Sequence, residues 1–355
     1  MAEDIRPAGP GEFTRLAFLN GRLDLSQAEA VIDVIRSKSD KGMRLALRQL
    51  QGTNAHYIAA LEDGLTWINA MLEASLDFPD EVGDPDYDEI RQRIDAMLDQ
   101  LDKMLAAAKR SQVYYEGVSV AICGKPNVGK SSWLNILLQK EKAIVTDIPG
   151  TTRDVIEDYL NIRGIPVKLM DTAGIRASEE PVEKIGVTRS YQVIEQADLV
   201  ILMLDAAAGV TPEDMKIYEL IDRDRLIVLV NKEDVREKKL DEKALRELFP
   251  GVKIIHGSAL EMTGLTQLET AIEEAVLSGQ LETDNLELMI NARQQSLLER
   301  AHRHLQDTRA ALGSVPLDCL GVDTMAALEA LGEISGKNLK EEAIDRIFQE
   351  FCIGK

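Results

Sequence analysis

The feature that most constrains the fold is a glycine-rich segment between a short apolar strand and a helix. Residues Gly124-Lys-Pro-Asn-Val-Gly129-Lys130-Ser131 have the spacing G-x4-G-K-S. The apolar run 118–123 precedes them, and an amphipathic helix is expected over residues 131–139. The glycines let backbone N–H groups approach phosphate oxygens, Lys130 would neutralise phosphate charge, and Ser131 would offer a hydroxyl to Mg²⁺. Because a chance glycine turn does not require this flanking strand and helix, the segment predicts a phosphate-binding loop.

Short apolar strands alternate with amphipathic helices over residues 116–278. The expected strands are 118–123, 156–162, 167–170, 199–204, 226–230 and 252–255, and the expected helices are 131–139, 183–196, 213–222, 241–248 and 264–277. Such alternation predicts a mostly parallel sheet covered on both faces. Only residues 163–166 join the second strand to the third, which is too short for a helical crossover, so these two strands must be antiparallel.

The segments on either side of this region have helical periodicity. Apolar residues recur at three- and four-residue spacing over 20–112, apart from a break at Phe78-Pro79-Asp80, and a helix is expected from Tyr87 to Arg110. Residues 285–351 are again helical in pattern. We therefore expect an α/β domain (116–278) inserted into a discontinuous all-α domain (1–115, of which 1–19 is a linker, and 279–355). Two separate helical domains remain the alternative.

Composition excludes several classes of protein. The 355 residues are 45% apolar, which excludes a disordered chain despite a net charge of -20. No apolar run approaches the ~20 residues of a membrane span. The three cysteines are scattered, which favours reduced thiols in the cytoplasm. The acidic balance alone would favour an enzyme acting on small molecules or proteins over a nucleic-acid binder.

Three further motifs indicate a guanine nucleotide. Asp171-Thr-Ala-Gly174 follows one expected strand and would bring a carboxylate toward the metal and an amide toward the γ-phosphate. Asn231-Lys-Glu-Asp234 follows another, where the Asp234 carboxylate can accept both guanine N1–H and N2–H₂, a donor pair that adenine lacks. Ser258-Ala259-Leu260 follows the last strand and would support the base. Four motifs in order at the carboxyl ends of strands give a unit that resembles a Ras-like P-loop GTPase domain.

The details resemble one family of such GTPases more closely than others. Ras-type proteins place a glutamine directly after the glycine of the third motif, whereas Ile175 stands here. The segment 142–154, KAIVTDIPGTTRD, and Asn127 in the phosphate loop resemble the bacterial tRNA-modification GTPase family MnmE (TrmE), rather than Era or EngA. The resemblance extends over nearly the whole chain, through PGEFT at 10–14, AFLNGRLDL at 17–25, QAEA at 27–30, DFPDE at 77–81 and FCIGK at 351–355.

The resemblance implies roles for individual residues. Lys130, Thr152 and Glu183 would act in catalysis, with Glu183 polarising the attacking water; the alternative for Glu183 is an exposed acid in the first turn of a helix. Ser131 and Thr152 would bind Mg²⁺ directly and Asp171 through water, while K⁺ would be held by Asn127, Thr146, Ile148 and Thr151 when two G domains meet. The implied GTP contacts are Gly124, Asn127, Val128, Gly129, Lys130, Ser131, Ser132, Thr146, Asp147, Ile148, Pro149, Gly150, Thr151, Thr152, Asp171, Thr172, Ala173, Gly174, Asn231, Lys232, Asp234, Ser258, Ala259 and Leu260.

The resemblance also implies a pathway and partners. GTP hydrolysis stimulated by potassium through G-domain dimerisation would serve carboxymethylaminomethyl modification of the wobble uridine of tRNA, together with an FAD-dependent partner of the MnmG type. Cys352 becomes a candidate for the modification chemistry, with plain packing as its alternative. In the family, a domain that binds folate (of the 5-formyltetrahydrofolate type) precedes the PGEFT segment, so only Arg22 and Lys355 would remain here at its edge. The tRNA would be contacted through the partner or a local basic patch, which comprises Arg36, Lys38, Lys41, Arg44 and Arg48. A solvated helix face is the favoured alternative for that patch.

Two other functions fit parts of the sequence. A GTP-controlled binding switch would use the same motifs to recruit a partner, with incidental hydrolysis, and would stay slow in single turnovers whatever the cation. An Era- or EngA-like ribosome-assembly GTPase would carry a KH-like GxxG segment or a second P-loop, and neither is found in the sequence.

Overall fold

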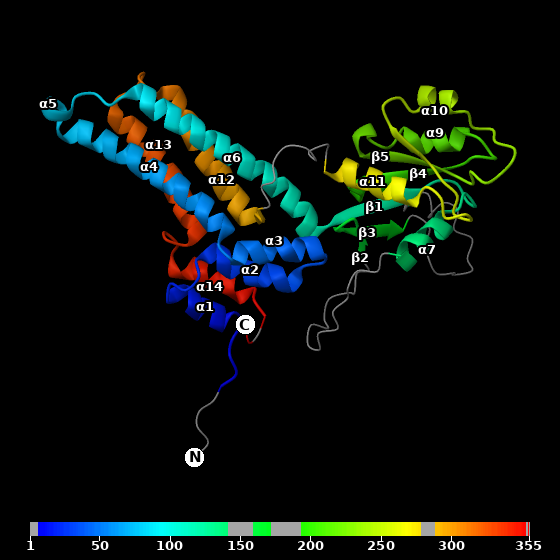
Figure 1. Cartoon of the computed structure of the whole chain (residues 1–355), viewed down its shortest axis with the longest axis horizontal. Coiled ribbons are helices and arrows are strands. Elements are labelled where there is room, and N and C mark those ends of the chain that lie inside the picture. The colour runs from blue at the N-terminus through cyan, green and yellow to red at the C-terminus, as the bar shows by residue number, and fades with distance from the viewer. Residues whose placement is uncertain (1–5, 141–158, 172–192, 278–287, 353, 355) are drawn as a thin grey trace, which may run out of the picture. The chain divides into compact units, whose positions relative to one another are not determined.

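A computed structural model of the chain describes residues 6–140, 159–171, 193–277, 288–352 and 354 (Figure 1). The chain forms two compact units. One comprises Met1–Gln112 together with Asp284–Lys355, and the other comprises Val113–Thr283. Among the described residues, no helix is long and apolar enough to cross a membrane.

The second unit is built on a six-stranded mixed sheet with the order β2-β3-β1-β4-β5-β6. The strands are β1 (Val118–Cys123), β2 (Tyr159–Ile162), β3 (Ile165–Asp171), β4 (Leu199–Asp205), β5 (Leu226–Asn231) and β6 (Lys253–His256). Strands β1, β3, β4, β5 and β6 run parallel to one another. The edge strand β2 is antiparallel to β3, with Tyr159 opposite Lys168, which confirms the expectation from their short connection.

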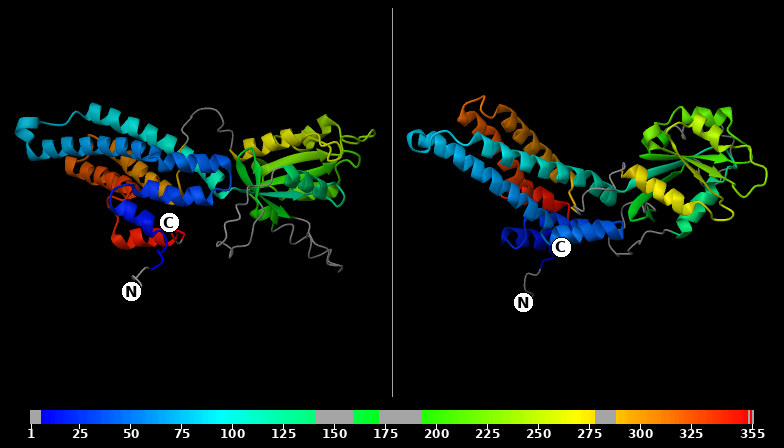
Figure 2. Two further views of the ribbon diagram at one scale, coloured as in Figure 1. Left: turned by 60° about the horizontal axis from the view of Figure 1, so that its bottom comes forward. Right: turned by 45° about the horizontal axis from the view of Figure 1, so that its top comes forward.

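Helices lie on both faces of this sheet (Figures 1 and 2). They are α7 (Lys130–Lys140), α9 (Pro212–Tyr218), α10 (Glu242–Leu248) and α11 (Leu265–Val276), and residues 193–196 are also helical. Tyr218 from α9 and Leu245 from α10 pack on buried residues of β1, β4 and β5, while α11 contacts β2, β4, β5 and β6. The helix expected over 213–222 is shorter, because it ends at Tyr218 and a 3₁₀ turn at Arg223–Arg225 leads into β5.

The first unit is helical throughout its described elements. It contains α1 (Glu12–Leu19), α2 (Leu25–Arg36), α3 (Asp40–Leu50), α4 (Thr53–Asp77), α5 (Pro79–Val82), α6 (Tyr87–Glu116), α12 (Ala292–Ala311), α13 (Leu317–Ser335) and α14 (Glu341–Gln349). The prediction that α6 ends at Arg110 was wrong. Residues 111–116 contain no glycine or proline, so the helix continues to Glu116 and ends before Gly117, whose φ is +81°.

Both ends of the chain contribute to one helical core. Leu61 and Leu65 of α4 are fully buried in a cluster with Leu305 of α12 and Leu331 of α13. A buried polar contact also joins the two segments. Arg293 at the start of α12 donates to the Glu29 carboxylate of α2 from Nε at 2.6 Å and from a terminal nitrogen at 2.9 Å. The helical unit is therefore complete only when the segment that precedes the sheet unit in the sequence packs against the segment that follows it.

The PGEFT segment near the start of the sequence and the FCIGK tail at its end also contact each other within this unit. Gly11, in the PGEFT segment, donates its backbone N–H to the Cys352 carbonyl at 3.2 Å. A Cβ at Gly11 would lie 2.8 Å from the Phe348 carbonyl oxygen, so only glycine allows this approach. Phe351 of the tail is buried in a small core with Leu25 and Phe348. The two segments are therefore joined by a backbone hydrogen bond and a close approach that needs glycine at position 11.

Candidate nucleotide-binding site

The glycine-rich loop joins the end of β1 to the start of α7. Gly124 has a φ of +138° and Gly129 a φ of +105°, conformations that favour glycine. A Cβ at Gly124 would also lie 2.5 Å from the Met203 carbonyl oxygen of β4. The Lys130 ammonium donates to the carbonyl oxygens of Gly124 at 2.6 Å and Lys125 at 2.7 Å. Lys130 thus reaches back across the loop, where it also faces the side on which a phosphate would approach the backbone N–H groups.

Asn231, at the end of β5, links three segments of the site. Its side chain is almost completely buried, at 2% exposure. The amide nitrogen donates to the Val128 carbonyl in the phosphate loop at 2.7 Å. The amide oxygen accepts from Trp133 Nε1 on α7 at 2.9 Å and from the Ala259 N–H at 3.1 Å. One side chain therefore fixes the phosphate loop, the first turns of α7 and the loop after β6 with respect to one another.

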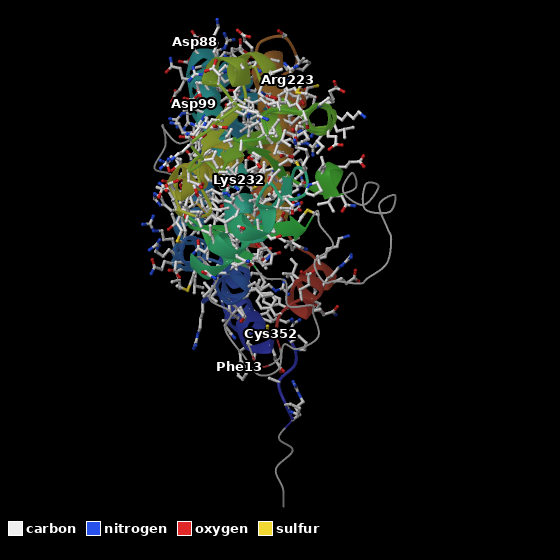
Figure 3. The ribbon with its side chains drawn as sticks, turned by 90° about the vertical axis from the view of Figure 1, so that its right-hand side faces the viewer. Phe13, Asp88, Asp99, Arg223, Lys232 and Cys352 are labelled. Atoms are coloured by element: carbon white, nitrogen blue, oxygen red, sulfur yellow. The ribbon has the colours of Figure 1, made fainter. Side chains whose placement is uncertain are left out.

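Lys232 pairs with the end of the neighbouring strand. It has a left-handed backbone, with a φ of +66°, and it follows β5 directly (Figure 3). Its ammonium lies 2.6 Å from the Asp205 carboxylate at the end of β4. Burial raises the pKa of Asp205, but the hydrogen bond from Lys232 and those from backbone N–H groups outweigh it, so the pKa of Asp205 is lowered. Asp205 is consequently a fixed negative charge that orients Lys232.

Asp234 is the one acid of this motif whose carboxylate is exposed. The hydroxyl of Ser258, which is fully buried, donates to Asp234 Oδ1. Ser258 Oγ in turn accepts the Glu261 N–H at 3.1 Å. The carboxylate is thus oriented from behind and open to solvent in front, as recognition of a guanine edge requires. Leu260, beside it, is 82% exposed.

The outer part of the predicted site lies outside the described residues. This holds for the potassium and magnesium candidates Thr146, Ile148, Thr151 and Thr152, for Asp147, Pro149 and Gly150, for Thr172, Ala173 and Gly174, and for Glu183. The backbone of Asp171 is described: it ends β3 and lies in register with Ile122 of β1, two residues before the loop begins at Gly124. The third motif therefore starts beside the phosphate loop, as its order along the strands predicted.

The oxygen atoms that the described residues of the site offer as ligands suit hard cations. Ser131 is exposed in the first turn of α7 and offers a hydroxyl oxygen, a ligand that Mg²⁺ accepts. Asn127 is exposed, with a φ of +63°, and offers an amide oxygen. Another potential metal-binding group lies in the helical unit, where ligand atoms of His304, Asp307 and Asp323 lie within 4.8 Å of one another. A hydrogen bond of 3.0 Å between His304 Nδ1 and Asp323 accounts for that proximity.

The residues assigned to folate and to the modification chemistry lie in the helical unit. Cys352 is half-buried, and it is labelled in Figure 3 together with Phe13 of α1, which is 62% exposed. Arg22 is exposed in the turn between α1 and α2. Lys355 is outside the described residues.

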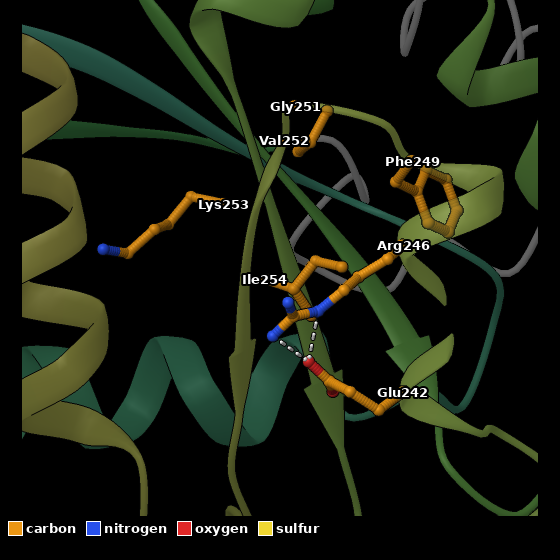
Figure 4. A pocket seen from close by; sticks show the side chains of 7 residues that line it. All are labelled: Glu242, Arg246, Phe249, Gly251, Val252, Lys253 and Ile254. Atoms are coloured by element: carbon orange, nitrogen blue, oxygen red, sulfur yellow. Dashed lines mark hydrogen bonds and ion pairs between the residues drawn. The ribbon is translucent and has the colours of Figure 1, made fainter. Parts of the chain in front are cut away.

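One surface pocket of about 500 Å³ lies beside β6 and α10 (Figure 4). Its lining includes the exposed ion pair Glu242–Arg246, at 2.9 Å, and Lys253. None of its lining residues belongs to the four nucleotide motifs. We assign no function to it.

Sequence reasoning missed three residues that shape the site. Trp133 was given no role, yet its indole is fully buried and bonds Asn231. Asp205 fixes Lys232, and Asp214 at the start of α9 holds Lys125 of the phosphate loop at 2.9 Å. Only Asp214 had a visible signal, because Thr211-Pro-Glu-Asp214 has the spacing of a capping box.

Comparisons with known proteins show the family of the chain. Residues 25–352 match a family model described as the MnmE helical domain. The tRNA modification GTPase MnmE of Syntrophomonas wolfei subsp. wolfei is 63% identical over 355 residues, which cover 100% of this chain and 77% of that protein. The tRNA modification GTPase MnmE of Bacillus subtilis is 41% identical over 358 residues, covering 100% of this chain and 78% of that protein. Among solved structures, the FeoB G-domain from Methanococcus jannaschii is 28% identical with a TM-score of 0.33, covering 45% of this chain and 97% of that one. The chain belongs to the MnmE family of tRNA modification GTPases.

Proposed function

We propose that this chain binds GTP with Mg²⁺ at the Gly124–Ser131 loop and hydrolyses it to GDP and phosphate in the service of tRNA modification. The observation that carries the proposal is the Asn231 side chain, which joins the phosphate loop to the loop that orients Asp234. Phosphate binding and base recognition thereby share one frame. Transfer of the γ-phosphoryl group to water relies mainly on such positioning and on charge neutralisation.

Guanine selection is tested by changing Asp234 to Asn. The carboxylate accepts two hydrogens from guanine, whereas the amide replaces one acceptor with a donor. Asp234→Asn is expected to weaken GTP binding and to improve binding of xanthosine triphosphate, whose base carries an oxygen where guanine carries its amino group. Titration of both nucleotides against the wild-type and variant chains measures this. Undiminished GTP affinity in the variant would remove Asp234 from the base site.

Hydrolysis is proposed to be stimulated by K⁺ when two G domains meet. Asn127, Thr146, Ile148 and Thr151 would hold K⁺, Thr152 and Ser131 would bind Mg²⁺, and Glu183 would orient the attacking water. K⁺ would supply positive charge beside the transferred phosphoryl group. Phosphate release is expected to be faster in KCl than in NaCl and to rise with protein concentration, and GDP with aluminium fluoride and K⁺ is expected to shift the chain to a dimer. Equal turnover in both salts at every protein concentration would contradict this part of the proposal.

Glu183→Ala separates binding from hydrolysis. The variant is expected to bind GTP as the wild type does and to lose turnover, because its role is to position water rather than nucleotide. The alternative, an exposed acid at a helix start, predicts unchanged turnover. Single-turnover phosphate release in KCl distinguishes the two, and it also distinguishes the hydrolase from a slow binding switch.

The wider role is proposed from the family. The G domain, residues 116–278, would be inserted into a discontinuous helical domain, and the protein would work in the cytoplasm. An FAD-dependent partner of the MnmG type would supply most of the tRNA contact. Cys352 would serve the wobble-uridine chemistry, and folate would require the domain that precedes PGEFT in the family, with Arg22 and Lys355 at its edge. Cys352→Ser is expected to retain GTP hydrolysis and lose tRNA modification in a reconstituted assay. Full modification by this variant would reduce Cys352 to packing.

A further inference from the structure

Lys125, the second residue of the phosphate loop, bonds to the first turn of α9. Its ammonium lies 2.9 Å from Asp214 Oδ2 and donates to Thr211 Oγ1 at 2.9 Å. The Lys125 side chain is 16% exposed and that of Asp214 is fully buried. A cation in a phosphate-binding loop is thus bound to a buried anion of the same unit.

The Asp214 carboxylate is itself held firmly. Its Oδ2 atom also accepts the Thr211 N–H at 2.9 Å and the Thr211 hydroxyl at 2.8 Å. Thr211 directly precedes α9, and α9 follows β4, the neighbour of β1 in the sheet. The contact therefore anchors the start of the phosphate loop to an adjacent element of the sheet unit.

The anchor reaches the catalytic lysine through the main chain of Lys125. Lys130 Nζ donates to the Lys125 carbonyl at 2.7 Å, so the position of Lys125 sets one of the two loop carbonyls that orient Lys130.

We propose that Asp214 is a positioning residue for the nucleotide, which holds Lys125 away from the phosphates and keeps the loop in its phosphate-binding conformation. The inference rests on the proposed GTP binding, and it assigns Lys125 the role of an anchor rather than of a phosphate ligand. Two physical effects then have opposite signs at Asp214. Removing a buried negative charge near the loop strengthens anion binding by Coulomb's law alone, whereas losing the anchor weakens it.

The test measures the affinity of the full chain for fluorescent GDP and GTP analogues. Asp214→Asn and Lys125→Met are each expected to weaken the binding of both nucleotides by about tenfold or more, because each leaves the other charged group without its opposite charge. The double variant is expected to bind no more weakly than either single variant, since both disrupt one contact. Lys125→Arg, which keeps the charge and donors, is expected to retain affinity. Lys253→Met, which breaks the exposed 2.9 Å pair with Glu274, is the control and is expected to bind as the wild type does.

Each outcome decides whether Asp214 positions the nucleotide-binding loop or serves stability alone. Unchanged or tighter binding by Asp214→Asn overturns the proposal, even if its unfolding midpoint falls, because the contact would then serve stability alone. Additive losses in the double variant also overturn it, since Lys125 would then contact the phosphates independently. If Asp214→Asn does not fold by circular dichroism, Lys125→Met and Lys125→Arg carry the test. Failure of the wild-type chain to bind GDP or GTP overturns the proposed function itself, which distinguishes the two failures.

Discussion

Asn231→Ala is the substitution that tests the organisation of the site most directly. Asn231 is 2% exposed and makes three hydrogen bonds, to the Val128 carbonyl, the Trp133 indole N–H and the Ala259 N–H. Alanine removes the donor and the acceptor together. Trp133 is fully buried, so its indole N–H is then left without a partner.

The cost follows from these contacts. A buried donor left unsatisfied costs about 1–3 kcal/mol, and each of the other two lost hydrogen bonds contributes about 1 kcal/mol. We therefore expect Asn231→Ala to lower the free energy of unfolding of the sheet unit by about 3–5 kcal/mol. Trp133→Phe removes the indole donor and leaves a small cavity but keeps the other two bonds of Asn231, so it is the matched control, with an expected loss of about 2 kcal/mol.

The assay has to report on the sheet unit alone. The chain has two tryptophans, Trp67 in α4 and Trp133 in α7. In a Trp67→Phe background, the fluorescence of Trp133 during urea unfolding therefore follows the sheet unit. The Trp133→Phe control has no tryptophan in this background, so labelling of the buried Cys123 thiol of β1 follows the sheet unit in its place. Nucleotide affinity is measured on the same samples.

The reasoning fails in either of two cases. One is a free energy of unfolding within about 1 kcal/mol of the parent, which would mean that the three bonds contribute nothing net. The other is a destabilised variant that still binds GTP at full affinity where it is folded, which would show that the loops keep their positions without Asn231.

Three further predictions concern other parts of the chain. Burial raises the pKa of Cys123 to about 12, so a thiol reagent at pH 8 is expected to label exposed Cys319 in the native protein and Cys123 only in urea; equal rates would contradict this. Glu29→Gln is expected to destabilise the helical unit by about 3 kcal/mol, because it breaks a buried ion pair, and Trp67 fluorescence in a background without the other tryptophan measures it; a loss under about 1 kcal/mol would refute the estimate. The hydrogen bond from Arg6 lowers the pKa of Glu12 from 4.5 to about 2, so its contribution to stability is present above pH 4.5 and is lost as the pH falls toward about 2. Arg6→Ala is expected to return that pKa toward 4.5 in a carboxyl NMR titration, and an unchanged pKa would exclude the contact in solution.

Most of the sheet could be predicted from the sequence because its strands are short apolar runs between turn residues. The expected strand 118–123 coincides with β1, and 199–204 and 226–230 each fall one residue short of β4 and β5. Those two missed residues are Asp205 and Asn231, which lie opposite each other in the last pair of the β4–β5 register. Helix ends were predicted less well, since α6 runs past Arg110 through residues that neither favour nor forbid helix.

The nucleotide-binding motifs could be identified from the sequence, but the separate contacts of the residues within each motif could not be predicted. Spacing shows that Asn231, Lys232 and Asp234 lie together after a strand, and it does not show where each side chain points. Trp133 carried no signal at all, because an aromatic residue on a helix usually indicates packing. Contacts between residues about a hundred positions apart, such as that between Trp133 and Asn231, follow from the fold and not from local pattern.

The residues of the motif Asn231-Lys-Glu-Asp234 therefore have two separate roles, in holding the site together and in recognising the base. The side chains of Asn231 and Lys232 form hydrogen bonds with other parts of the protein, namely the phosphate loop, α7 and Asp205. Asp234 alone presents an exposed carboxylate, and Ser258 holds it from behind. Since a recognition group is selective only when it is fixed, the buried Asn231, the half-buried Lys232 and Ser258 are what allow one exposed acid to discriminate between bases. It follows that substitutions at Asn231 should weaken GTP and GDP together with stability, whereas substitutions at Asp234 should change base preference and leave stability intact.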